Sequence, residues 1–386
     1  MPLLSRSCYD CGEPLQAMSL NGSQDHVVVA SKTHLLTFQL LPEFVSSQQF
    51  HLSSEGGGGN NFKMTDVEWN KFDNEKVATS ATNGSIAVFN LNTRQSKQPK
   101  QEWESGEISR AVNRISWHAG DRYQLLSAHQ DGQVKIWDTL RQKNPCLKVM
   151  VGGPADACRE AKFDPFHPNL LAAIYENGTL KVWDRRYIDQ VLYRISAHAE
   201  SGLTLEWSPN REGLLATGSR DKTVKIWDLT VFDEIGEGEK IIPSSSNARP
   251  LHVIHTPAPL ESISWRPGDG PNTHRLFQIA TTSSNEVGRG DINIWDATNP
   301  NVPACVLRGH TDGCTGFQWL DPPSNPNFFQ HIISVGKDSK ILVQDLRNGY
   351  FPGQHMNGHV VAVSAMGHVA FQRGSVYRVS TSQYLQ

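Results

Sequence analysis

The residues whose spacing comes nearest to a chemical site are Cys8 and Cys11, which form a Cys-x-x-Cys pair. This spacing is half of a zinc or redox site, because a closed structural zinc needs four ligands. The other four cysteines supply no second close pair and lie at Cys146, Cys158, Cys305 and Cys314. We therefore interpret Cys8 and Cys11 as two thiols on a terminal strand, and we expect no metal site.

The common catalytic and nucleotide-binding patterns are absent from the sequence. It contains no G-x-x-x-x-G-K-[ST], G-x-S-x-G or H-E-x-x-H motif. The glycine-rich stretch at 55–61 opens no helix, so we interpret it as a flexible connector and not as a phosphate cradle. The titratable residues are spread around hairpin turns. We expect a protein that is not an enzyme, with no cofactor and no small-molecule substrate.

Composition excludes further classes of function. The 386 residues include 36 Lys and Arg against 39 Asp and Glu, and no basic cluster stands out, so a nucleic-acid surface is unsupported. The first residues lack the apolar core of a signal peptide, and no apolar stretch approaches the ~18 residues of a membrane span. We expect a cytoplasmic chain without direct membrane insertion, attached to membranes only through other proteins.

A repeated segment gives the strongest structural signal. Each copy has a tight-turn pair followed by polar and apolar residues in alternation, which predicts a turn that leads into a half-buried strand. Most copies end forty to fifty residues apart, the period of a four-stranded propeller blade, and the interval from Asp228 to Asp296 is longer because it contains the stretch at 235–250. They read TNGSIAVFN (82–90), QDGQVKIWD (130–138), ENGTLKVWD (176–184), RDKTVKIWD (220–228), RGDINIWD (289–296) and KDSKILVQD (337–345).

These repeats predict an all-β fold, a seven-bladed β-propeller that occupies residues 1–386 as one domain. A strand with an aromatic residue precedes each hairpin, and a weaker blade without tryptophan comes first. Either 5–10 or 360–372 closes the ring, since an open end leaves backbone groups unpaired. We expect exposed loops at 235–250 and 321–327. The predicted blades are 14–52, 64–103, 111–151, 157–196, 201–254, 259–308 and 313–372.

The KIWD, KVWD and IWD endings resemble the hallmark of the WD-repeat family along nearly the whole chain. In that family a His, a Ser or Thr, an Asp and the Trp form a hydrogen-bonded relay that is structural and not catalytic. The resemblance assigns this relay most completely to His198, Thr217, Asp221 and Trp227. Two other sets are partial: His310, Ser334 and Asp338 meet Gln344 in place of Trp, and Ser127, Asp131 and Trp137 lack an obvious His.

The stretch DVEWNKFDNEKVATSATNGSIAVFNLN (66–92) is similar to one blade of the WD repeat-containing protein 24 family, propeller subunits of the GATOR nutrient-sensing assembly. The resemblance implies a scaffold in GATOR sub-complex 2 that acts positively in amino-acid signalling to TOR complex 1. It implies a place at the lysosomal or vacuolar membrane. The implied partners are other propeller-bearing subunits, including nucleoporin-like proteins. Members continue into a helical region and a RING-type zinc module, whereas this sequence ends at Gln386, so zinc binding is not carried over.

A different function stays open as an alternative. Trp183, Asp184, Arg185 and Arg186 fit the W-D-x-R ending with which substrate receptors of cullin-type ubiquitin ligases dock their adaptor. A basic residue after the hairpin is also common in such blades simply because it is solvated. Recovery of other GATOR propeller subunits, or of a cullin adaptor, separates the two functions.

Overall fold

Tight turns divide the chain into short antiparallel strands. Gly84 and Gly178 each take a positive φ, 89° and 76°, in the turns that precede the third strands of two blades. An Asn-Gly pair suits such a hairpin turn because glycine adopts this backbone conformation without steric strain. The computed structural model describes residues 6–40, 45–51, 63–92, 99–105, 110–142, 146–151, 156–230, 248–268, 277–283, 290–320, 331–352, 359–363, 369–373 and 376–379.

Seven four-stranded sheets form the blades. The first three are β2–β5 (Ala17–Leu20, His26–Ala30, His34–Gln39, Val45–His51), β6–β9 (Met64–Trp69, Lys76–Ala81, Ile86–Asn90, Lys100–Glu104) and β10–β13 (Val112–His118, Asp121–His129, Gln133–Asp138, Cys146–Val151). The next three are β14–β17 (Cys158–Phe163, Leu170–Tyr175, Thr179–Asp184, Val191–Ser196), β18–β21 (Gly202–Trp207, Leu214–Ser219, Thr223–Asp228, His252–His255) and β22–β25 (Leu260–Trp265, Gln278–Ser283, Gly290–Asp296, Cys305–His310). Blade seven contains β26 (Cys314–Leu320), β27 (His331–Gly336), β28 (Lys340–Asp345) and β1 (Arg6–Asp10), and a 3₁₀ turn, η3 (Leu346–Asn348), follows it.

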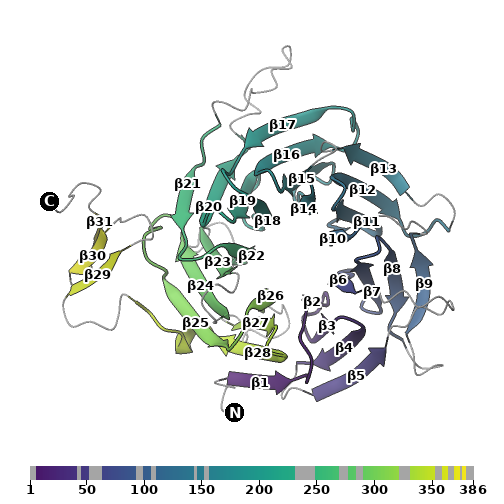
Figure 1. Cartoon of the computed structure of the whole chain (residues 1–386), viewed down its shortest axis with the longest axis horizontal. Coiled ribbons are helices and arrows are strands. Elements are labelled where there is room, and N and C mark those ends of the chain that lie inside the picture. The colour runs from purple at the N-terminus through teal and green to yellow at the C-terminus, as the bar shows by residue number, and fades with distance from the viewer. Residues whose placement is uncertain are drawn as a thin grey trace.

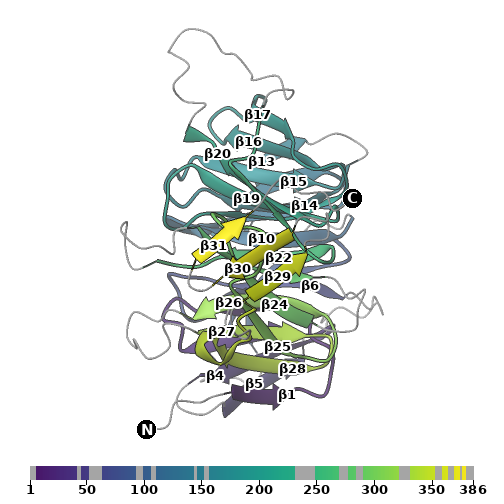
Figure 2. The same cartoon turned by 90° about the vertical axis from the view of Figure 1, so that its left-hand side faces the viewer.

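The blades stand around a central axis, with the first strand of each nearest the centre (Figure 1). Seen from the side, the blades form a disc (Figure 2). This arrangement confirms the prediction of an all-β, seven-bladed propeller. Within each blade the strands follow sequence order outward from the axis, and only blade seven takes its outer strand from elsewhere in the chain.

The ring is closed by the N-terminal strand. Strand β1 pairs antiparallel with β28, from Arg6 opposite Gln344 to Asp10 opposite Lys340. Of the two closing segments expected from the sequence, 5–10 is therefore the one used. The described sheet of blade seven therefore does not extend to residue 372 as predicted, and the single domain over 1–386 stays a prediction. Strands β29 (His359–Val363), β30 (Val369–Arg373) and β31 (Val376–Val379) form a separate three-stranded sheet that joins no blade.

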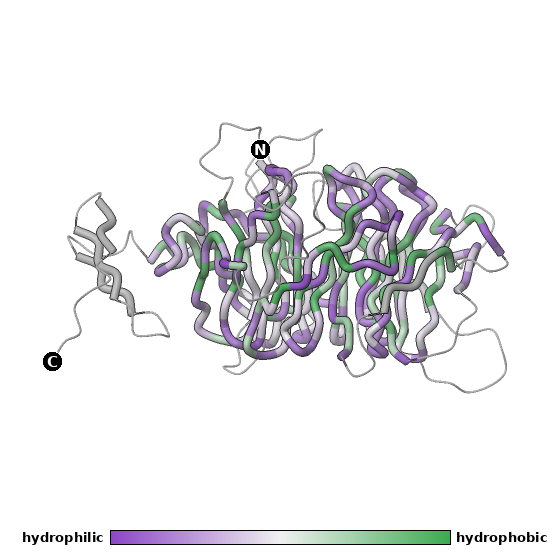
Figure 3. Tube along the Cα trace, turned by 90° about the horizontal axis from the view of Figure 1, so that it is seen from above, coloured by the Kyte–Doolittle hydropathy of each residue, from purple (hydrophilic) through white to green (hydrophobic). Residues whose placement is uncertain are grey.

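The hydrophobic cores lie between neighbouring blades. One cluster combines Leu20 and Phe38 of blade one with Ile333 and Val343 of blade seven, and the six other clusters each bridge two adjacent blades in the same way. Each sheet is therefore apolar on both faces, and hydrophilic and hydrophobic residues alternate along the coloured part of the tube (Figure 3). The predicted loop at 321–327 lies outside the described residues, as does that at 235–250 except for 248–250.

Candidate functional site

The four relay residues come together in blade five. His198 lies in the loop before β18, and its Nδ1 is 3.0 Å from Oδ2 of Asp221 in the β19–β20 turn. The other ring nitrogen, Nε2, is 2.8 Å from Oγ1 of Thr217. The same hydroxyl accepts the indole N–H of Trp227 at 2.9 Å. The chain of contacts therefore connects an inter-blade loop to the second and third strands of the blade.

The hydrogen bonds of this relay are all donated in one direction, from Trp227 towards Asp221. A carboxylate only accepts, so Nδ1 of His198 carries the proton and Nε2 accepts from the hydroxyl of Thr217. Burial lowers the pKa of His198, which keeps the ring neutral near pH 7 although Asp221 opposes that shift. Burial acts to raise the pKa of Asp221, but hydrogen bonds from His198 and Thr223 outweigh it and hold this pKa below its usual value. No relay hydroxyl is left to act as a nucleophile.

Other blades hold shorter versions of the relay. In blade seven, His310 contacts Asp338 at 2.9 Å and Ser334 at 2.9 Å, while Gln344 turns away and donates to the carbonyl of Arg308. In blade six, the indole of Trp295 donates to Thr281 at 3.0 Å.

The partial relay of blade three contains a histidine that sequence reasoning missed. His129 ends β11, and its Nε2 is 2.7 Å from Oγ of Ser127, which also accepts from Trp137. The histidine was expected in the inter-blade loop, whereas here it comes from the same strand as the serine. The pattern LLSAH, with His two residues after Ser, was the available signal.

The inner strands are linked by polar side chains that accept backbone N–H groups from the next blade. Such contacts satisfy donors that the ladder of their own sheet does not use. The acceptor–donor pairs are Ser19–Trp69 (3.0 Å), Asp66–Ile115 (3.0 Å), Glu68–Trp117 (2.6 Å), Glu160–Leu205 (2.8 Å), Glu206–Trp265 (2.7 Å) and Gln318–Leu20 (2.8 Å). We call this set the channel ladder.

The aromatic residues that end the inner strands add a second link between blades. The indole N–H of Trp207 donates to the carbonyl of Lys162 at 3.1 Å, and that of Trp265 donates to the carbonyl of Glu206 at 3.0 Å. Trp117 makes the equivalent bond to Glu68 at 3.1 Å. These tryptophans therefore bridge blades, whereas Trp227 bonds within its own blade.

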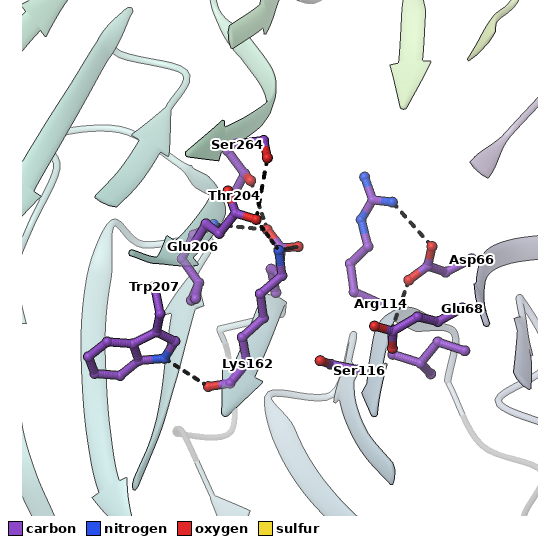
Figure 4. A network of polar contacts seen from close by, with 12 residues as sticks. Asp66, Glu68, Arg114, Ser116, Lys162, Thr204, Glu206, Trp207 and Ser264 are labelled. Carbon is purple, nitrogen blue, oxygen red and sulfur yellow. Dashed lines mark hydrogen bonds and ion pairs between the residues drawn. The ribbon is translucent and has the colours of Figure 1, made fainter. Parts of the chain in front are cut away.

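Two basic residues lie among the acids of the channel ladder: Arg114 beside Asp66, and Lys162 near Glu206 (Figure 4). Nζ of Lys162 lies 3.4 Å from Glu160 and 3.8 Å from Glu206, and Arg114 lies 3.4 Å from Asp66. The contacts of Arg114 with Asp66 and of Lys162 with Glu206 link neighbouring blades, whereas Lys162 and Glu160 lie on the same strand, β14.

Desolvation sets the pKa values of the ladder acids. It raises the pKa of Glu68 to about 7 and also raises that of Glu206. Desolvation acts in the same direction on Glu160, but Lys162 and Arg114 outweigh it and hold the pKa of Glu160 below its usual value. Each of these carboxylates accepts a backbone N–H from the next blade, so the ladder joins the inner strands into a structural lattice.

The repeat identity follows from comparison with known families. The family model of the WD domain, G-beta repeat, matches residues 99–138 and 189–228, which carry the third strands of blades three and five. The chain is a WD40-repeat protein. A chain in the crystal structure of the mitotic checkpoint complex has the same fold, with a TM-score of 0.67 over 88% of this chain and 93% of that chain at 14% identity.

This WD40-repeat protein is homologous to one group of relatives over most of its length. It is 30% identical to the GATOR2 complex protein WDR24 of Homo sapiens over 93% of the chain, and 27% identical to Wdr24 of Drosophila melanogaster over 92%. The matched region spans 41% of each of these relatives. The chain therefore spans less than half the length of these relatives.

The W-D-x-R segment lies at the end of the third strand in WD40 blade four. Trp183 and Asp184 are buried, and Arg186 is largely exposed but bonds back to Asp184 through Nε and Nη2. Arg185 donates to Asn169 at 3.1 Å and to Gln124 of blade three.

Blade seven repeats this arrangement without the tryptophan. Arg347 binds Asp345 through the same two nitrogens, after Gln344. The Asp–Arg contact is thus a local feature of the hairpin end. Adaptor docking by Trp183, Asp184, Arg185 and Arg186 stays a prediction.

The remaining motif lies on the closing strand and just after it. Cys8 is exposed on β1, and Cys11 follows that strand, packed beside the core between blades seven and one. Burial raises the pKa of Cys11 to about 12, so its reactive thiolate is scarce near pH 7. Within the described ranges, no three His, Cys, Asp or Glu side chains gather in a way that would hold a metal ion. The part of the chain that the structure describes contains no helix long and apolar enough to cross a membrane.

Proposed function

We propose that this chain is a subunit of GATOR sub-complex 2 whose propeller is a non-enzymatic scaffold for other proteins. The observation that carries the proposal is the homology to GATOR2 complex protein WDR24, because it extends over 93% of the chain. The proposed partners are the other propeller-bearing subunits, nucleoporin-like proteins among them. The complex acts positively in amino-acid signalling to TOR complex 1, from the cytoplasmic side of the lysosomal or vacuolar membrane.

The geometry of the described residues supports a scaffold over an enzyme. The buried hydroxyl, imidazole and carboxylate of the relay bond to one another within blade five. Charged residues of the inner strands bind neighbouring blades. Interlocked blades give a stiff disc whose rims and loops present a large surface, which suits the binding of several proteins at once.

Affinity purification tests the proposal. The tagged chain is expressed at its natural level in cells, and an unrelated WD40 propeller with the same tag is the control. We expect other GATOR2 subunits to co-purify with the chain and to be absent from the control. Recovery of a cullin adaptor in their place would overturn the proposal and favour docking through residues 183–186.

A signalling assay tests the finer part of the proposal. Cells without the endogenous protein are starved of amino acids and then supplied with them again. We expect the chain, in its natural full-length context, to restore phosphorylation of TOR complex 1 substrates. Equal phosphorylation in cells with and without the protein would refute a role in this signal, without contradicting membership of the complex.

A further inference from the structure

A ring of bulged residues surrounds one mouth of the central channel. In six blades, the pairing of the first two strands shifts near the start of the inner strand. Such a β-bulge leaves one residue out of the ladder and re-aims its side chain. The residues concerned are Thr65, Asn113, Arg159, Leu203, Glu261 and Thr315, and Gln16 precedes β2 in blade one. All seven line one cavity of about 540 Å³, which we call the upper mouth.

The described lining of the upper mouth is basic. Five of its residues are cationic and one is acidic, although the whole chain has a formal net charge of -3. Positive charge is therefore concentrated at this mouth although the chain as a whole carries a net negative charge. This local charge favours an anionic ligand. The cationic residues are Lys32, Lys63, Arg114, Arg159 and Lys337, and the acidic residue is Glu261.

Three lysines supply charge that nothing in the described part of the chain neutralises. Lys32, Lys63 and Lys337 are exposed, and none of their ammonium groups pairs with a carboxylate among the described residues. They belong to blades one, two and seven, which are consecutive around the ring. We call these residues the lysine arc.

Arg159 adds an unused donor to the same cavity. Its Nη2 binds Glu176 at 2.7 Å, but its Nε is buried and has no hydrogen-bond partner among the described residues. A buried donor without a partner is rare in folded proteins and costs stability. An acceptor supplied by a ligand in the upper mouth would satisfy it.

The other lining residues favour a peptide over a compact polyphosphate. Thr65, Thr82 and Asn113 offer uncharged polar groups, whereas Met64 and Leu203 are apolar. A peptide can place a carboxylate on the lysine arc while its amides and side chains meet these groups. Phosphates crowded into the cavity would bring negative charge against Glu261. A volume of about 540 Å³ falls within the ~300–1,000 Å³ of ordinary ligand pockets.

We propose that the upper mouth binds an acidic peptide segment of a partner protein, with its carboxylates on the lysine arc. The proposal rests on the scaffold function and names the surface and the chemistry through which one partner docks. It also predicts binding that weakens with salt, because exposed charges are screened.

Fluorescence anisotropy tests the proposal with the full chain. The probe is a fluorescein-labelled octapeptide of alternating Glu and Leu, and the control probe has Gln in place of Glu. We expect the acidic probe to bind and the Lys32→Glu/Lys63→Glu/Lys337→Glu variant to weaken binding at least tenfold. Equal binding of the two probes, or of wild type and variant, would overturn the proposal.

A matched variant separates local contacts from net charge. Lys100→Glu/Arg220→Glu/Lys222→Glu changes the formal charge equally at exposed positions outside the cavity lining. We expect this variant to bind the acidic probe within twofold of wild type, with both variants melting close to wild type. Displacement of the probe by inositol hexakisphosphate at lower concentration than by unlabelled peptide would show a polyphosphate site and refute the proposal. If the lysine-arc variant loses binding of the probe but still co-purifies with GATOR2 subunits, the scaffold function remains supported.

Discussion

Replacing Thr217 with valine removes the hydroxyl at the centre of the blade-five relay while keeping the shape of the side chain. Thr217 is fully buried, accepts from Trp227 at 2.9 Å and lies 2.8 Å from Nε2 of His198. The substitution therefore leaves an indole N–H and an imidazole nitrogen without partners inside the protein.

The expected loss follows from those two groups. A buried polar group without its partner costs about 1–3 kcal/mol, so two that share one environment give a combined loss of roughly 2–4 kcal/mol. Thr217→Ser is the matched control, because it keeps the hydroxyl and removes a methyl group. Loss of one buried methyl costs about 0.5–1.5 kcal/mol, so valine should destabilise blade five more than serine does.

Hydrogen exchange is the assay that places the loss in one blade. A ring of repeats need not unfold in a single step, so a global melting curve mixes the blades. Peptides covering β19 and β20 should exchange faster in Thr217→Val than in Thr217→Ser, while those covering β7 and β8 stay unchanged. Thr281→Val in blade six gives a second comparison, because Thr281 accepts from Trp295 and the described contacts give it no histidine. Its expected loss is about half as large. Equal exchange in the Val and Ser variants of Thr217 would refute the relay as a source of stability.

Three further predictions concern the same blades and the channel ladder. Trp227→Ala should destabilise blade five by ~3–5 kcal/mol through lost packing, measured by exchange in β19 and β20, and an unchanged rate would contradict the assignment. Lys162→Met should destabilise the ring by about 3–5 kcal/mol in urea unfolding because Glu160 and Glu206 lose their shared cation, whereas Lys162→Arg should retain most of the stability. The pKa of Glu68 is raised in the folded state from 4.5 to about 7, so the folded protein holds this proton longer and its contribution to stability falls as pH rises between those values. Glu68→Gln should flatten that dependence relative to wild type, and identical pH profiles would show that Glu68 does not titrate there.

Local signals in the sequence were sufficient to predict the blades. The repeat predicted at 220–228 contains strand β20, and that at 176–184 contains strand β16. Both are flanked by turns whose chemistry is visible within a few residues. Ring closure was left open because β1 and its partner β28 lie at opposite ends of the chain, and alternation within a strand does not identify its distant partner.

The channel ladder could not be predicted from single strands because five of its contacts join residues 45 to 59 positions apart, and Gln318 and Leu20 are 298 positions apart. Glu68 binds the backbone of Trp117, and Glu206 binds that of Trp265. A signal was nevertheless present. A polar residue stands directly before the aromatic in the inner strands of blades two to seven, as in VEW (67–69) and LEW (205–207). Since side chains alternate in a strand, these polar residues face away from the aromatic side.

Closure by β1 has a consequence for synthesis of the protein on the ribosome. Asp10 pairs with Lys340, so about 330 residues must be made before the first strand meets its partner. At ~5–20 residues per second this takes roughly 15–70 s, during which an unpaired strand is exposed to other nascent chains. The backbone groups of β28 and β1 that pair in the closed ring therefore meet only after the other six blades have been made.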